Sequence, residues 1–111
     1  QIYKTSSEVG IEETASSIPD FFSLKIRPTV SLSYLVVCDY GIKRQGRVSL
    51  RIYNIAGKLV KELLNRNIEP DNYVIIWDGT NQNGEKVRAG HYFVRLESDK
   101  FSKTEKVILI R

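Results

Sequence analysis

The sequence predicts an all-β protein folded as an antiparallel β-sandwich, and three observations support this class. Apolar and polar residues alternate with a period of two from Phe21 onward, as in strands that bury one face. Turn signals rich in glycine and asparagine separate these strand-length segments. No segment shows a convincing helical period. Short strands joined by turns, without helices, indicate two packed sheets.

Seven strands are expected, over residues 22–27, 31–40, 47–55, 58–64, 73–77, 91–98 and 104–110. The fourth also fits a helical period, but it is short and follows a tight turn at Ala56-Gly57, which favours a strand. Gly57 is expected to take a positive φ there. This spacing is typical of a seven-stranded antiparallel sandwich of the immunoglobulin or fibronectin type III kind.

Two regions of different composition divide the chain. Residues 1–20 are small and polar, with one Lys against four acids, and are expected to be a linker that is extended or loosely docked. Residues 21–111 carry the strands and the excess of basic residues, and form the predicted domain. The start resembles no signal peptide, so we expect the chain to be cut from a longer precursor.

The charge pattern bears on possible partners. The formal net charge is +4, and a basic domain can meet nucleic acid or an anionic surface. Here the charges alternate with apolar residues along the strands, which is typical of a solvated sheet face. No stretch approaches the ~20 apolar residues of a membrane helix. We therefore expect neither nucleic-acid binding nor membrane insertion.

Residues suited to catalysis or metal binding are few. Cys38 is the single cysteine and lies among apolar residues, so it is expected to be a small buried hydrophobe. His91 is the single histidine, and an exposed strand position is expected for it rather than a place in a Ser-His-Asp arrangement. No His/Cys cluster has the spacing of zinc ligands. The sequence thus predicts a protein without enzymatic activity, cofactor or metal.

The segment 78–85 partly resembles a calcium loop. Asn81, Asn83 and Gly84 fit the alternating oxygen ligands before a glycine. Gly79, however, occupies the first ligand position, and Gly90 stands where the bidentate carboxylate belongs. We therefore predict a pair of turns stabilised by Asx side chains.

Trp77 is the only tryptophan and ends an apolar strand, so it is expected to fill the core. The alternative is an exposed sugar-stacking platform shared with Tyr53, Tyr73 and Phe93. Strand alternation does not place all of these side chains on one face.

Several motifs in order resemble bacterial secretion modules. Residues 48–60 resemble the hydrophobic-Ile-Tyr-Asn-x-x-Gly-Lys-x-Val hairpin of type IX secretion sorting domains and of the related Ig-like domain of the flagellar hook-capping protein. The Trp-Asp-Gly, Asn-Gly and Gly-x-Tyr elements that both share match residues 77–79, 83–84 and 90–92. Residues 103–111 resemble the Lys-rich apolar last strand of sorting domains. Arg27-Pro28-Thr29 stands where many of them have Pro-Asn-Pro.

The resemblance implies a C-terminal sorting and surface-anchoring module of a larger secreted bacterial protein, located outside the cell or on its surface. Its partners would be the secretion and anchoring machinery at the outer membrane and the upstream passenger domain, and a monomer is expected. The residues that match the family's signal are Gly90, Tyr92, Lys106 and Arg111.

Each of these four residues also has an ordinary structural interpretation: Gly90 as a turn, Tyr92 as core, Lys106 and Arg111 as charges at a strand edge. Between those charges, residues 107–110 are expected to be buried on both faces. Two other functions stay open, namely a structural Ig-like assembly or spacer domain of the hook-cap kind, and a carbohydrate-binding accessory module.

Overall fold

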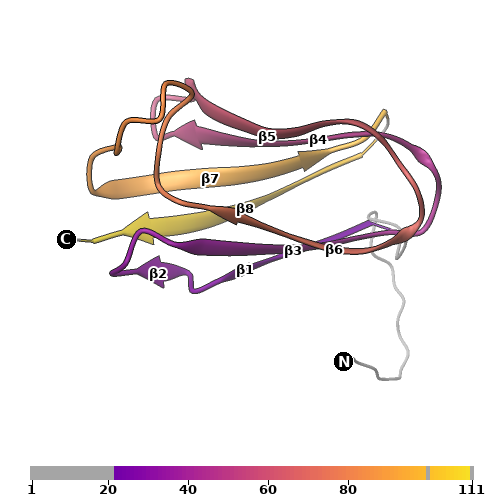
Figure 1. The fold of residues 1–111 in the computed structure, drawn as a ribbon, viewed down its shortest axis with the longest axis horizontal. Coiled ribbons are helices and arrows are strands. Elements are labelled where there is room, and N and C mark those ends of the chain that lie inside the picture. Colours follow the sequence, from indigo (N-terminus) through magenta and orange to yellow (C-terminus); the bar gives the residue numbers. More distant parts are fainter. Residues whose placement is uncertain (1–21, 100, 111) are drawn as a thin grey trace.

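Two β-sheets pack face to face in the computed structural model, which describes residues 22–99 and 101–110 (Figure 1). The predicted linker, residues 1–20, and Arg111 lie outside the described residues. The strands are β1 (Phe22–Arg27), β2 (Val30–Ser31), β3 (Val36–Ile42), β4 (Gly46–Asn54), β5 (Leu59–Ile68), β6 (Asp71–Trp77), β7 (Gly90–Glu97) and β8 (Ser102–Leu109). The predicted all-β sandwich is confirmed, and the described residues form eight strands in place of the seven expected.

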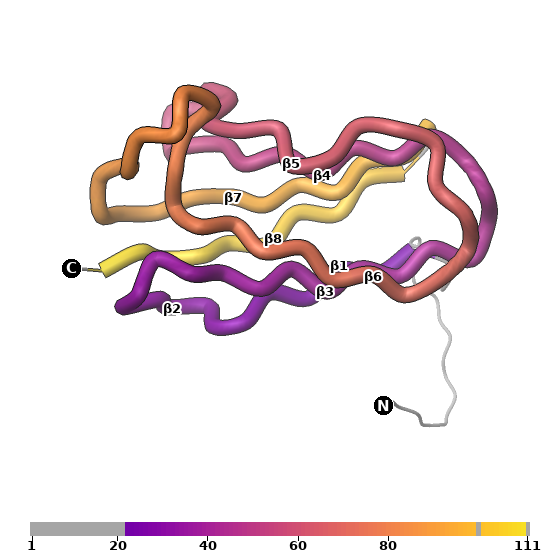
Figure 2. The backbone as a smooth tube through the Cα atoms, in the orientation of Figure 1, coloured from indigo at the N-terminus to yellow at the C-terminus, as the bar shows by residue number. Residues whose placement is uncertain are grey.

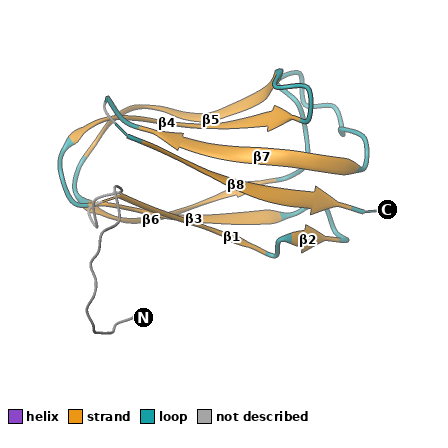
Figure 3. Ribbon diagram, turned by 180° about the vertical axis from the view of Figure 1, so that it is seen from behind, coloured by secondary structure: helices purple, strands orange, loops and turns teal. Residues whose placement is uncertain are grey.

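The strands divide into a small and a large sheet, seen from behind in Figure 3. The small sheet has the order β1-β3-β6, and the large sheet has the order β2-β8-β7-β4-β5. Every pair is antiparallel except β2 with β8, which is parallel, so the expectation of a wholly antiparallel fold is wrong at this short pair. Figure 2 shows that the β3–β4 and β5–β6 connections both cross between the sheets at the end opposite the C-terminus. Among the described residues, nothing helical has the length and apolarity needed to cross a membrane.

Two strand predictions need correction. The expected strand over 31–40 is interrupted between β2 and β3, where Tyr34 takes a φ of 67° and the Ser31 hydroxyl donates to the Leu35 carbonyl at 2.9 Å. The expected loop over 65–72 is mostly strand, because β5 continues to Ile68. Its polar residues look like a loop in the sequence, yet Asn67 pairs with Arg47 across the sheet edge.

The core lies between the two sheets and follows the predicted alternation. Trp77 and Cys38 are fully buried, as expected. On the last strand, Val107 and Leu109 are buried while Ile110 beyond it is 39% exposed. The expectation that this segment is buried on both faces is wrong, since only the inner face of the large sheet is covered. The buried apolar set is Phe22, Leu24, Ile26, Tyr34, Val36, Cys38, Tyr40, Ile42, Val48, Leu50, Ile52, Ile68, Trp77, Tyr92, Val94, Leu96, Val107 and Leu109.

Candidate recognition surfaces

The β7–β8 hairpin brings three of the four predicted signal residues together. Gly90 pairs with Leu109, Tyr92 with Val107, and Lys106 with Phe93. These residues lie on one hairpin but on different faces, because side chains alternate along a strand. The fourth, Arg111, lies outside the described residues.

Tyr92 faces the core. Its side chain is buried, and its hydroxyl donates to the carbonyl of Arg88 at 2.7 Å. Its ring meets Trp77 edge-on, with centroids 5.4 Å apart, and burial is the main cause that raises the pKa of Tyr92. A buried ring whose hydroxyl already has a partner serves packing, so the interpretation of Tyr92 as a core residue is confirmed.

Gly90 and Lys106 differ from Tyr92 in what they offer a partner. Gly90 begins β7 with a φ of 149°, and a Cβ there would meet no atom within 4 Å. A glycine is favoured at position 90 because of its backbone conformation, and not because a side chain would lack space. Lys106 is exposed on the outer face of the large sheet, as is His91 one residue after Gly90. Of the signal residues that the structure describes, Lys106 is the one whose charge faces solvent.

The Trp-Asp-Gly turn is a closed network. The Trp77 indole donates to the Thr80 carbonyl at 2.8 Å, and the Asp78 carboxylate accepts the Thr80 hydroxyl and its backbone N–H. Lys61 from β5 donates to the Thr80 hydroxyl at 2.9 Å. These contacts, led by the Thr80 hydroxyl, lower the pKa of Asp78. The motif therefore fixes β6 to the core and to β5.

The residues that resemble a calcium loop are used in turns. The Asn81 side-chain oxygen accepts the N–H groups of Asn83 at 2.9 Å and Glu85 at 3.0 Å, and Gly84 has a φ of 82°. This is the Asx-stabilised turn that the sequence predicts. Within residues 22–99 and 101–110, no three His, Cys, Asp or Glu side chains gather as a metal site.

Four charged side chains form a network on the outer face of the large sheet. Arg51 contacts Glu62 at 2.8 Å and Glu97 at 3.6 Å, and Arg95 contacts Glu97 at 3.7 Å. The hydrogen bond between Arg51 and Glu62 is the largest cause that raises the pKa of the guanidinium and lowers that of the carboxyl. Such mixed charges keep this face solvated.

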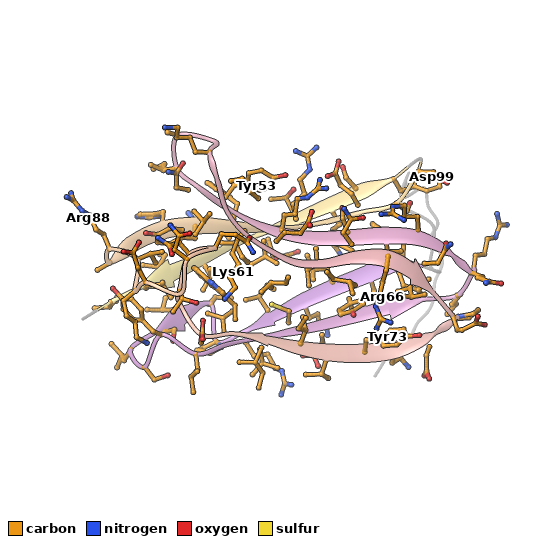
Figure 4. All side chains as sticks on the ribbon, turned by 45° about the horizontal axis from the view of Figure 1, so that its top comes forward. Tyr53, Lys61, Arg66, Tyr73, Arg88 and Asp99 are labelled. Carbon is orange, nitrogen blue, oxygen red and sulfur yellow. The ribbon has the colours of Figure 1, made fainter. Side chains whose placement is uncertain are left out.

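The aromatic residues proposed as a sugar platform are divided between the two sheets. Tyr53 and Phe93 pair on the outer face of the large sheet. Tyr73 instead stacks on Tyr40 on the inner face of the small sheet, with ring centroids 5.3 Å apart. Figure 4 shows Tyr53 and Tyr73 on opposite layers. Because Trp77 lies in the core, the four aromatic side chains do not form one common surface for a sugar.

The outer face of the small sheet carries apolar side chains that sequence reasoning missed. Val74 and Ile76 of β6 are 61% and 56% exposed, and Ile76 pairs with the half-buried Val37 of β3. We call these three residues the β6 patch. The available signal was the unbroken apolar run of residues 73–77, since a strand buried on one face alternates with polar residues.

Fold and surface together define an immunoglobulin-like β-sandwich module, in which the Trp-Asp-Gly and Asn-Gly turns hold the architecture together. The model of the FlgD Ig-like domain family matches residues 43–101, more than half of the 111 residues. The chain belongs to this family.

A solved structure has the same fold. The chain superposes on part of the dimeric latent PorU from Porphyromonas gingivalis with a TM-score of 0.65 and 19% sequence identity, over 93% of this chain and 10% of that chain. The chain thus spans about a tenth of the length of that protein. No curated protein matches the sequence.

Proposed function

We propose that this Ig-like module is a non-catalytic sorting and surface-anchoring signal for type IX secretion, carried at the C-terminus of a larger secreted bacterial protein. The observation that carries the proposal is the placement of the signal-like residues. Gly90, Tyr92 and Lys106 fall on one β7–β8 hairpin, next to the Trp-Asp-Gly turn through the contact of Tyr92 with Trp77. In this proposal, the outer-membrane machinery recognises the folded module by binding the surface of this hairpin.

The residues divide into scaffold and contact. Tyr92 and Gly90 shape the hairpin, while Lys106 presents a charge on its exposed face. We propose that the secretion and anchoring machinery contacts Lys106, together with Arg111 beyond β8, and that the passenger precedes the module in the same precursor. The module then acts as a monomer on a secreted or surface-bound protein, without a cofactor.

A reporter fusion tests this proposal. The whole chain is fused to the C-terminus of a periplasmic reporter in a host that has the type IX apparatus. Export is expected, and Lys106→Ala with Arg111→Ala is expected to abolish it while leaving the thermal melt unchanged. Lys25→Ala is the matched control, because Lys25 is exposed on the other sheet. If the unaltered fusion stays in the periplasm while a known sorting domain exports the same reporter, the sorting proposal is wrong.

Family membership supports a second function, a structural Ig-like assembly or spacer domain of the hook-cap kind. In that case the module holds neighbouring domains at a fixed distance, and the double substitution changes nothing. A carbohydrate-binding role has the weakest support, because Trp77 is buried and the other aromatic residues lie on different layers.

A further inference from the structure

The end of the sandwich opposite the C-terminus contains a pocket of about 190 Å³ between the two sheets, which we call the end pocket. The start of β1, the β3–β4 connection and the β7–β8 turn meet at this end (Figure 2). Cofactors and drug-sized ligands occupy pockets of about 300–1,000 Å³. The end pocket is smaller than these, and its size suits protein side chains better than a cofactor.

The floor of the end pocket is apolar. Phe22, Ile42 and Val48 line it, and all three belong to the core between the sheets. Phe101, after the β7–β8 turn, also lines the pocket and is half-buried against the same core. Burial of a further apolar side chain on such a floor removes apolar surface from water and is therefore stabilising.

Two arginines make the rim of the end pocket basic. Arg44, in the β3–β4 connection, and Arg47, on β4, are both exposed there. Asp99 is the acid that lines the pocket, so the rim keeps a net positive charge. An occupant that combines an apolar side chain with a carboxylate therefore matches both parts of the pocket.

The chain enters β1 at this pocket, because Phe22 is both the first residue of the strand and part of the pocket lining. The four residues before it, 18–21, have the sequence Ile-Pro-Asp-Phe. Residues 1–20 carry one Lys against four acids, which is the opposite charge to that of the rim. A segment joined to its site by so short a connection has an effective concentration in roughly the millimolar range.

We propose that residues 18–21 dock in the end pocket of their own chain, with the Ile18 side chain against Phe101 and the Asp20 carboxylate beside Arg44. The segment crosses the end of the sandwich from the small sheet to the large sheet and covers the core there. A domain that precedes the module is thereby held next to this end of the sandwich by a fixed junction. This inference is independent of the proposed sorting role.

Strand geometry supports the placement of Ile18. Pro19 fixes its own φ near about −65° and favours an extended conformation at Ile18. Alternate residues of an extended segment share a side, so Ile18 and Asp20 lie on the side of Phe22, which faces the core. From Phe22 back to Ile18 the segment reaches about 13 Å, which is enough to cross the ~10 Å between two packed sheets.

The register of the small sheet makes Arg44 the expected partner of Asp20. β1 and β3 pair in an antiparallel register in which Phe22 lies opposite Ile42. The same register carried two residues back from Phe22 sets Asp20 opposite Arg44. Opposite charges on facing positions stabilise such a pairing, and Arg47 on the same rim adds to the attraction.

A segment from another chain is a poorer occupant of the end pocket. It has to displace residues 18–21, which are tethered beside the pocket at an effective concentration of roughly millimolar. A second copy of this chain offers the same segment without that advantage, so exchange between copies is disfavoured in dilute solution.

NMR on the isotope-labelled full chain tests the proposal. NOEs are expected from the Ile18 methyl groups to the Phe101 ring, and the backbone order parameters of residues 18–21 are expected to be about 0.85, as in rigid backbone. Ile18→Ser is expected to remove these NOEs and to lower the order parameters below about 0.6. Ile11→Ser is the matched control, because it removes the same side chain from outside residues 18–21, and is expected to change neither.

A charge-reversal cycle tests the contact of Asp20 with Arg44. Asp20→Arg is expected to speed hydrogen exchange at the Phe22 amide, which the docked segment covers, about two- to fivefold. Arg44→Glu is expected to do the same, and the two substitutions together are expected to restore slow exchange. Glu13→Arg makes the same charge change outside the segment and is expected to leave the rate unchanged. Unchanged amide shifts in β4 and β7 distinguish loss of docking from unfolding in every variant.

Three results would overturn the proposal. They are order parameters below about 0.6 for residues 18–21 of the unaltered chain, absence of NOEs between Ile18 and Phe101, and a double variant that exchanges as fast as the single ones. A mixture of labelled and unlabelled chains identifies the source of the segment. NOEs between Ile18 of one copy and Phe101 of another would also overturn docking within one chain, in favour of exchange between copies.

Discussion

The outer faces of the two sheets differ in the side chains that they expose to solvent. The face of the large sheet holds Arg51, Glu62, Glu97 and Arg95 in contacts of 2.8 to 3.7 Å. The face of the small sheet presents the β6 patch next to a single ion pair, between Arg27 and Asp39 at 2.7 Å. The inner faces must fit one core, whereas an outer face is free to suit water or a partner. The difference separates an outer face that is solvated by paired charges from one that leaves apolar side chains exposed.

The comparison requires that the inner face of the small sheet is covered by the core, although its outer face leaves Val74 and Ile76 exposed. Cys38 lies on that inner face, and burial raises the pKa of its thiol to about 12. Only the thiolate reacts, so labelling by a thiol reagent at pH 8 is expected to be about a thousandfold slower than in the unfolded chain. Labelling kinetics across a urea series provide the measurement. Fast labelling of the native protein would mean that the small sheet opens by itself.

Substitutions at two adjacent residues of β6 distinguish its buried face from its exposed face by their effect on stability. Trp77→Ala is expected to lower the free energy of unfolding by about 3–5 kcal/mol, because it empties a large core position. Ile76→Ala is expected to cost less than about 1 kcal/mol, since that side chain is 56% exposed. Urea unfolding of both variants, with Trp77→Phe as control for the first, measures the two values. Equal costs would contradict the assignment of faces.

Two glycines in turns, Gly57 after β4 and Gly79 after β6, are expected to differ in how much an alanine lowers stability. Gly57 has a φ of 83° with open space around its Cα, so Gly57→Ala is expected to cost about 1 kcal/mol from backbone strain alone. Gly79 has a φ of 76°, and a Cβ there would lie 2.6 Å from the ring of Tyr34. Gly79→Ala is therefore expected to cost more. Thermal melts decide, and a smaller cost at Gly79 would show that Tyr34 moves aside freely.

The smallest expected effect concerns the charged face. The pKa of Glu62 is lowered in the folded protein by its hydrogen bond with Arg51. Its contribution to stability is therefore present above the unfolded-state pKa of about 4.3 and is lost as pH falls through the folded-state pKa. The melting-temperature difference between the protein and Arg51→Ala should shrink over that acid range and in high salt. A difference independent of both would mean that Arg51 acts through packing.

Local alternation was enough to predict most of the core. It places Phe22, Leu24 and Ile26 on the buried face of β1, and the turn chemistry of Gly57 and Asn81 is also readable. Alternation fails where the local sequence is polar but a strand distant in sequence provides pairing partners. The polar residues 65–67 extend β5 because β4 supplies partners, which no local pattern shows.

The candidate surfaces were harder to predict than the core. Motif resemblance brings Gly90, Tyr92 and Lys106 to one hairpin, but the burial of Tyr92 depends on Trp77 from another sheet. The β6 edge depends on sheet order, which arises from pairings distant in sequence. An apolar run such as residues 73–77 is equally consistent with a central strand until that order is known.

The contrast between the two outer faces is tested most directly with a small apolar probe. Isopropanol at a few per cent is added to the isotope-labelled protein, and NOEs from its methyl groups to protein side chains are recorded. The contrast predicts that these NOEs concentrate on Val74, Ile76 and Val37. NOEs concentrated instead on Tyr53 and Phe93 of the large sheet would contradict it.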